Sequence, residues 1–373
     1  MSRPKKTARY DGVRVAESPR KTRSIIFFVA INILSLICLV WALHGINFGL
    51  LWDEIEHLRW GWIAAGIAVN LFSYVIQAWR WRLVLAPVTP VPLRETLRAV
   101  FVGTYANEVL PLRSGEIIRC YLLARCRELP ISVTLASALI ERIFDGIWLV
   151  AAMIFTLRVS DLPGFIKDSG IFLAALLLVC AILLAVAMFW KEQALDAVLG
   201  ARWLGWVHVL IKDLHLIGHS RFLYYAFFLS LPFLLLQVFP IYAVMHAYDG
   251  LNHLPVVAAL TVAIMLRFNS VLPQAPGNVG TFPAAAIIGL RPFRRLVTSL
   301  PPVPRLVRRR AFETMAQNFS IILLAVLTIP LLVVGFIAVA LTGMNIGDIH
   351  RGAKKSMSER SKPPQDRPHD RVA

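Results

Sequence analysis

Three ionisable residues interrupt one apolar stretch of the sequence, which reads ALIERIFDGIW over residues 138–148. They are Glu141, Arg142 and Asp145, and on a helix this spacing keeps them within about one turn of each other. Carboxylates in such a setting are candidates for general acid or base chemistry, whereas an arginine can hold a phosphate through two parallel hydrogen bonds. A purely structural alternative is an ion pair between Arg142 and Asp145, which are three residues apart.

A second group of charged residues follows a proline in NEVLPLRSGEIIR, residues 107–119. Ser114 suits the N-cap of a helix that starts after it, and the backbone donors of a helix N-terminus attract anions. Glu116 then lies in the first turn, near the positive end of the helix dipole. We expect both groups to border one polar cavity, to which the second half of the chain also contributes. The candidate residues for this site are Asn107, Arg113, Glu116, Arg119, Glu141, Arg142, Asp145, Arg267 and Asn269.

The chain around these residues is strongly apolar. Of its 373 residues, 57% are hydrophobic and 16% are charged, whereas a soluble domain usually carries about 25% charged residues. Several apolar stretches approach or exceed the roughly 20 residues that a membrane-spanning helix needs. A charge at the centre of a span costs about 2.5–3.5 kcal/mol, so the charged face of 138–148 must meet protein or water. In a membrane, the anion that suits the polar cavity is a lipid head group.

The apolar stretches predict an all-α polytopic membrane protein with about six full spans. A basic leader precedes the first span, residues 47–59 form an outer loop, and the loop 87–98 is cytoplasmic because it is rich in arginine. The motif WRWRL at the end of the second span is interpreted as an aromatic and arginine interface anchor. The expected spans cover residues 25–46, 60–85, 132–157, 169–190, 221–247 and 313–343.

Two similar phrases, NEVLPLRSG and NSVLPQAPG, interrupt apolar sequence in opposite halves of the chain. Proline removes a backbone donor and glycine loosens the chain, so each phrase should break a helix in two. We expect one helix from about 97 to Leu110 and its partner after Ser114, then a second pair over 255–272 and from Thr281. Each pair is a re-entrant helical hairpin. The helix-breaking residues are Pro111, Gly115, Pro273, Pro276, Gly277 and Gly280.

An odd number of crossings separates the two hairpins, so they enter from opposite sides in an inverted repeat, as in many transporters. Two unrelated proline kinks are the alternative, since proline is common in membrane helices. In a further alternative, residues 255–290 cross the membrane once. The arginine-rich segment 291–310 and the C-terminal tail then exchange sides of the membrane.

The formal net charge is +17, and the basic residues cluster in tails and loops beside apolar segments. This pattern is typical of the positive-inside bias and of contact with anionic lipids, so we expect no nucleic-acid partner. It predicts a multi-pass protein of the cell membrane with a cytoplasmic N-terminus. The expected organisation is a basic cytoplasmic tail over 1–24, a single membrane domain over 25–343 and a disordered basic tail over 344–373.

Neither a cofactor nor a metal is expected. His208, His215 and His219 have helical spacing, but they fall on a segment whose apolar residues, 203–214, suit a helix lying in the membrane interface. Nucleotide-binding and hydrolase signatures do not occur in the sequence, and the cysteines lack zinc or redox spacing.

The motifs together resemble the membrane domain of lysylphosphatidylglycerol synthase/flippase. They are NEVLPLRSGEIIR at 107–119, ERIFD at 141–145 and PGNVG at 276–280, with RWR at 80–82, and the similarity extends over roughly 25–345. The segment 291–312 departs from the pattern expected for the family. No soluble stretch is long enough for the aminoacyl transferase domain that relatives carry, so lysyl transfer is not expected.

The resemblance implies a flippase-like domain, not an enzyme, that moves a phospholipid or a lipid-linked molecule between leaflets. The head group would be held by Arg113, Arg119 and Arg142. Two alternatives remain: a non-transporting membrane partner of a separate lipid-modifying enzyme, and an intramembrane enzyme. The latter would use Glu116, Glu141 or Asp145 as a general acid or base.

Overall fold

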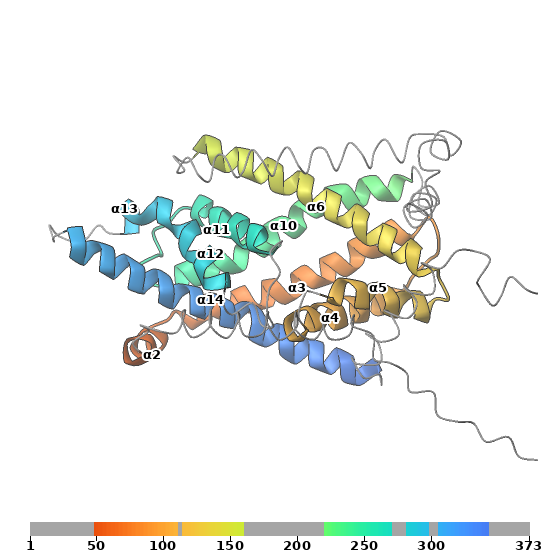
Figure 1. Cartoon of the computed structure of the whole chain (residues 1–373), viewed down its shortest axis with the longest axis horizontal. Helices are drawn as coiled ribbons and strands as arrows, with labels where there is room; N and C mark the ends of the chain where they lie inside the picture. Colours follow the sequence, from red (N-terminus) through yellow and green to blue (C-terminus); the bar gives the residue numbers. More distant parts are fainter. Residues whose placement is uncertain (1–47, 111–113, 160–219, 271–280, 298–304, 343–373) are drawn as a thin grey trace, which may run out of the picture.

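The computed structural model describes residues 48–110, 114–159, 220–270, 281–297 and 305–342. Within these ranges the chain is all-helical and contains no strand, which confirms the predicted fold class (Figure 1). The elements are α2 (Phe48–Glu56), α3 (Trp60–Leu85), α4 (Leu93–Val109), α5 (Gly115–Cys126), α6 (Ile131–Val159), α10 (Arg221–Ala247), α11 (Val256–Asn269), α12 (Thr281–Leu290), η3 (Arg291–Phe293), α13 (Arg294–Val297) and α14 (Arg305–Thr342).

Three helices of the described residues are long and apolar enough to cross a membrane: α3, α10 and the part Arg310–Leu341 of α14. At about 1.5 Å per residue, each exceeds the roughly 30 Å of a hydrocarbon core. The bounds of α3 and α10 match the spans predicted at 60–85 and 221–247. Helix α14 begins before the predicted residue 313, because the arginines and leucine of its first turns are good helix formers. The expected segments 25–46, 169–190 and 203–214 lie outside the described residues.

Helix α6 is 29 residues long and carries the ERIFD motif near its middle. Its length is sufficient for a span, but its three central charges set it apart from the apolar helices. The charged face packs toward α3 and α5, so protein rather than lipid meets most of it. This agrees with the prediction from insertion costs.

Helix α2 occupies most of the segment 47–59, which was predicted to be an outer loop between two spans, and this helix was not predicted. The helix forms because Ile55 and Leu58 pack against the core that α10 and α14 share. In addition, the Glu54 carboxylate accepts hydrogen bonds from Tyr248 and from Asn318 of α14, the latter at 2.7 Å.

Helices α4 and α5 form the first hairpin and lie side by side in Figure 1. α4 ends at Val109 and α5 begins at Gly115, as the proline and glycine pattern predicted. α4 starts earlier than residue 97, because Pro92 sets the extended backbone before it and Glu95 lies in its first turn. Ser114 occupies the N-cap position of α5, but its side chain makes no capping hydrogen bond, contrary to the prediction.

Two glycines let these helices approach closely. A Cβ on Gly115 would lie 1.8 Å from the Gly103 carbonyl oxygen, and one on Gly103 would lie 2.7 Å from the Arg119 Cβ. Gly115 therefore serves a backbone contact between two helices, in addition to its place beside the break.

The second hairpin consists of α11 and α12, and its break at 271–280 is outside the described residues. Val262 of α11 packs directly against Gly289 of α12, where a Cβ would lie 2.7 Å from the Val262 Cα. His253, before α11, contacts the Leu296 carbonyl oxygen of α13 at 2.7 Å, so the chain returns to the end from which it entered. This contact suits a hairpin better than the alternative in which 255–290 cross once.

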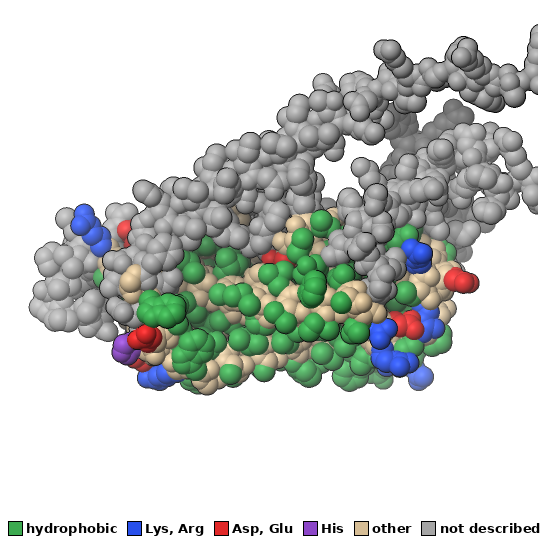
Figure 2. All heavy atoms as spheres, turned by 90° about the horizontal axis from the view of Figure 1, so that it is seen from below, with side chains coloured by type: hydrophobic (Ala, Val, Ile, Leu, Met, Phe, Trp, Pro, Cys, Tyr) green, Lys and Arg blue, Asp and Glu red, His purple; other side chains and the backbone are tan. Residues whose placement is uncertain are grey.

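The two hairpins open toward opposite ends of the helix bundle (Figure 1). We call one end of the bundle the Arg98 end and the other the Arg59 end. At the Arg98 end, α3 ends and α4, α6 and α10 begin. At the Arg59 end, the Arg59 amide donates to the Ala247 carbonyl at 3.2 Å and its side chain pairs with Asp249 at 2.9 Å, so α3 begins where α10 ends. The first hairpin opens at the Arg98 end and the second at the Arg59 end. The face in Figure 2 shows hydrophobic side chains between charged side chains at both ends.

Candidate functional site

The buried Arg80 of α3 lies at the centre of the polar interior. Its Nε donates to Glu141 Oε1 at 3.1 Å, and its Nη2 donates to Asp145 Oδ2 at 3.2 Å. Nη1 contacts Asp145 as well and donates to Ser230 Oγ of α10 at 3.0 Å. The guanidinium also lies 4.6 Å from the centre of the Phe233 ring. Arg80 thus connects α3, α6 and α10.

Arg119 is the corresponding buried arginine of the first hairpin. Its Nη2 donates to Glu141 Oε2 at 3.0 Å and lies 2.9 Å from Glu116 Oε2. Its guanidinium carbon is 4.8 Å from the centre of the Trp81 ring. Its Nε and Nη1 are buried and have no hydrogen-bond partner among the described residues. Arg119 therefore joins α5 to α6 and to α3.

Arg142 completes the group from the exposed side of α6. Its Nη2 donates to Glu116 Oε1 at 2.7 Å, and its Nη1 lies 3.7 Å from Asp145 Oδ2. The helical pair with Asp145 that the spacing suggested is thus present, but the contact across to α5 is shorter. The pairing with Glu116 brings together two of the residues that were predicted to border one polar cavity.

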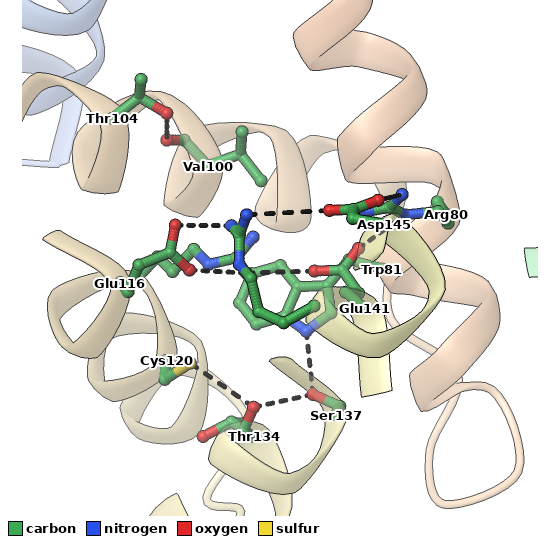
Figure 3. Close-up of polar contacts among 12 residues, drawn as sticks. Arg80, Trp81, Val100, Thr104, Glu116, Cys120, Thr134, Ser137, Glu141 and Asp145 are labelled. Atoms are coloured by element: carbon green, nitrogen blue, oxygen red, sulfur yellow. Dashed lines mark hydrogen bonds and ion pairs between the residues drawn. The ribbon is translucent and has the colours of Figure 1, made fainter. Parts of the chain in front are cut away.

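These six residues form a closed ring in which positive and negative charges alternate (Figure 3). Each carboxylate bridges two arginines, and each arginine bridges two carboxylates. Isolated charges would cost several kilocalories per mole each when buried, and pairing with good geometry offsets that cost. We call this set the charge ring; in order around it, its members are Arg80, Glu141, Arg119, Glu116, Arg142 and Asp145.

A second set of contacts fixes the helices that carry the charge ring. Trp81 Nε1 donates to Ser137 Oγ of α6 at 2.9 Å, and Ser137 donates in turn to the Thr134 carbonyl at 2.7 Å. Cys120 of α5 donates to the same carbonyl at 3.4 Å (Figure 3). α3, α5 and α6 are thereby held in register one turn away from the charges.

Arg80 and Trp81 were missing from the predicted site, because RWR was interpreted as an interface anchor. That interpretation was wrong for both residues, which are fully buried, although Arg82 is exposed. A signal was present in the sequence. The polar residues of this span recur every three or four positions and so mark one buried face of α3: Asn70, Ser73, Gln77 and Arg80.

Of the remaining predicted residues, the structure describes some and not others. Arg267 and Asn269 lie at the end of α11, where Asn269 is buried and Arg267 is half-buried. Asn107 is half-buried at the end of α4, and its Oδ1 has no hydrogen-bond partner in the described ranges. The other predicted positions lie outside the described residues: Pro111, Arg113, Pro273, Pro276, Gly277 and Gly280.

In the part of the chain that the structure describes, no group of three or more His, Cys, Asp or Glu side chains is arranged to hold a metal ion. The three histidines with helical spacing, His208, His215 and His219, are not among these residues. The site is therefore a set of arginines, carboxylates and amides.

Comparison with protein-family models matches residues 26–303 to the family described as lysylphosphatidylglycerol synthase TM region. The match includes α3 to α6 and both hairpins, and it reaches into the segment 291–312, which was expected to depart from the family. It ends before α14, whereas the resemblance was expected to continue to about residue 345. Comparisons with curated proteins and with solved structures found no match. Since the matched range covers most of the 373 residues, the chain belongs to the lysylphosphatidylglycerol synthase transmembrane-region family.

Proposed function

We propose that this membrane protein moves a phospholipid or a lipid-linked molecule between the two leaflets, with the head group passing at the charge ring. The observation that carries the proposal is the ring itself, which gathers six ionisable side chains from three helices of an otherwise apolar bundle. Ionisable residues inside membrane domains are expensive to maintain and typically mark the path of a substrate.

The arrangement of the two hairpins supports transport. They open toward opposite ends of the bundle, and such inverted elements typically meet near the bilayer midplane and form the substrate site of a transporter (Figure 1). We propose that both hairpins are re-entrant and that rocking of one half against the other exposes the ring to each leaflet in turn. The acyl chains of the lipid stay in the bilayer throughout.

The surroundings of the carboxylates favour transport over catalysis. A general base needs lone pairs that can reach a substrate proton. In the charge ring, Glu141 is fully buried and accepts from both Arg80 and Arg119, and Asp145 accepts from Arg80 beside Arg142. Glu116 is also paired on both sides. We therefore propose that the carboxylates position arginines and do not themselves perform chemistry.

We propose that the protein lies in the cell membrane with the Arg98 end in the cytoplasm. Exposed arginines surround this end, which fits the positive-inside bias: Arg82, Arg94, Arg98 and Arg125. Arginines of the segment 291–310 lie toward the Arg59 end and oppose this orientation. A cytoplasmic N-terminus follows if residues 25–46 form the first span.

The test is reconstitution of the purified protein in liposomes with a panel of fluorescent lipids. Phosphatidylglycerol, phosphatidylethanolamine and a lipid-linked sugar are compared in vesicles with wild type, with Arg142→Ala and without protein. The proposal expects at least one lipid to cross faster with wild type than in empty vesicles, and Arg142→Ala to slow it. Equal rates in all three kinds of vesicle would instead favour the alternative of a non-transporting partner of a lipid-modifying enzyme.

A further inference from the structure

The charge ring is not uniformly accessible, and its most exposed contact is the one between Glu116 and Arg142. Their side chains are 38% and 41% exposed, whereas those of Arg80 and Glu141 are fully buried and that of Arg119 is 2% exposed. On α6, the apolar Leu139 lies one turn before Arg142 and is exposed too. A molecule that approaches the ring from outside the described helices thus meets this contact more readily than those of Arg80 or Glu141.

The same contact can open without leaving a charge unpaired. Glu116 retains Arg119, which is three residues later on α5 at 2.9 Å, and Arg142 retains Asp145, which is three residues later on α6 at 3.7 Å. Opening the contact between Arg80 and Glu141, by contrast, separates two side chains that are fully removed from solvent. Because the cost of a broken ion pair is largest for buried charges, opening Glu116–Arg142 costs less than opening the contacts of Glu141 with Arg80 or Arg119.

From this geometry we propose that a phosphodiester head group displaces Glu116 from Arg142, so that Arg142 receives the lipid phosphate and Glu116 is its competing counter-ion. A guanidinium can donate two parallel hydrogen bonds to two phosphate oxygens. In the observed state, Arg142 uses Nη2 for Glu116. The displaced Glu116 carboxylate turns to Arg119, with which it already pairs.

The ring contains three arginines and three carboxylates, so a phosphodiester that takes the place of Glu116 at Arg142 exchanges one anion for another there. Buried Nε and Nη1 atoms of Arg119, which lack partners among the described residues, also leave donors for oxygen atoms close to the same contact.

This inference rests on the proposed function, in that it names the chemical class of lipid and the residue that holds it. It predicts that one substitution in the site increases the affinity for lipid. Removing the charge of Glu116 should strengthen the binding of an anionic phospholipid, whereas loss of a residue that merely stabilises the fold should weaken binding.

The experiment measures lipid binding to the purified protein in detergent by native mass spectrometry, without any transport step. The ligands are phosphatidylglycerol and diacylglycerol with the same acyl chains. For Glu116→Gln, we expect phosphatidylglycerol to bind about two- to fivefold more tightly, the range that an exposed ion pair allows, and diacylglycerol to be unaffected. Arg142→Gln should remove the preference for phosphatidylglycerol over diacylglycerol.

A matched control is Glu95→Gln. Glu95 lies on α4 of the same hairpin and pairs with Arg127 at 2.5 and 2.7 Å, with a side chain that is 32% exposed. This variant should bind both lipids as wild type does. Unchanged or weaker binding of phosphatidylglycerol by Glu116→Gln, or a retained preference in Arg142→Gln, would overturn the inference.

Two further arms complete the design. Arg142→Lys keeps the charge but loses the paired donors, so it should bind phosphatidylglycerol more weakly than wild type and still prefer it; wild-type affinity would count against the proposal. Soluble glycerophosphoglycerol carries the same head group without acyl chains and should bind more weakly than the lipid. Equal affinity would identify a water-soluble phosphodiester, not a lipid, as the ligand.

Binding and transport can fail separately. If Glu116→Gln shows the tighter binding but no lipid moves in liposomes, the inference about the site holds and the proposed transport function is wrong. If lipids move in liposomes but Glu116→Gln and Arg142→Gln bind them like wild type, transport holds and the assignment of Arg142 is wrong.

Discussion

At the scale of single residues, Arg80 is the member of the charge ring with the most contacts. It is fully buried and donates to Glu141, Asp145 and Ser230. Replacement by Met would remove the positive charge while retaining much of the side-chain volume. Because Glu141 and Asp145 would then lack their central partner, we expect a loss of about 3–5 kcal/mol of stability.

Thermal unfolding in detergent measures this effect, and Arg82→Met is the matched control because Arg82 is exposed two residues away on α3. The control should unfold close to the wild-type temperature. Equal shifts for the two variants would mean that the buried ion pairs contribute nothing specific to the fold.

Glu54 gives a pH-dependent prediction at the same scale. Burial raises the pKa of this carboxyl above its ordinary value of 4.5, although the hydrogen bond from Asn318 acts in the opposite direction. A raised pKa in the folded state means that Glu54 contributes stability at pH values below 4.5 and that the contribution is lost as the pH rises above it. Unfolding of wild type and Glu54→Gln across pH 4 to 8 tests this. The wild type should lose stability relative to the variant as the pH rises. A difference in unfolding free energy that stays constant with pH would exclude a shifted pKa of Glu54.

At the scale of elements, the close contact between α4 and α5 leads to a prediction about glycines. A Cβ on Gly115 would lie 1.8 Å from the Gly103 carbonyl oxygen, which is backbone and cannot rotate away. Gly115→Ala should therefore separate the two helices and cost about 1–3 kcal/mol or more, the usual range for overpacking.

Gly61 of α3 is the matched control, since a Cβ there would have no atom within 4 Å. Gly61→Ala should be neutral or slightly stabilising, because alanine is the better helix former. If both alanine variants unfold at the same temperature, the tight packing of the first hairpin is not a feature of the protein in solution.

The ends of several elements followed from local chemistry, so the sequence predicted them well. The proline and glycine pattern correctly ended α4 at Val109, started α5 at Gly115 and started α12 at Thr281. Helix α2 was missed because its formation depends on contacts of Ile55 and Leu58 with distant helices. Local propensity carries no information about such packing.

The site was only partly predictable for a related reason. Arg119, Glu141 and Arg142 stood out because charges in apolar sequence are costly, and the structure brings them together. Arg80 did not stand out, because an arginine near the end of a span suits either an interface or the interior. Which carboxylate pairs with which arginine depends on how α3, α5 and α6 pack, and this is a tertiary property.

At the scale of the whole molecule, the proposed orientation predicts which cysteines can be labelled from outside the cell. Cys126 lies exposed near the Arg98 end, and Asp249 lies at the Arg59 end with a side chain that is 71% exposed. In a single-cysteine background, a membrane-impermeant maleimide should label Asp249→Cys in intact cells. It should label Cys126 only after the membrane is opened. The reverse pattern would place the Arg98 end outside.

The most direct test of the central claim compares the rates at which fluorescent phosphatidylglycerol crosses the bilayer of liposomes containing wild type, Arg142→Ala or Arg94→Ala. Arg94 is an exposed arginine of α4 outside the charge ring, so it controls for the loss of one positive charge. The account predicts that Arg94→Ala moves the lipid at the wild-type rate and that Arg142→Ala slows it about tenfold or more, as loss of a charged hydrogen bond to the substrate implies. Equal rates for the two variants, both well above that of empty vesicles, would contradict passage of the head group at the charge ring.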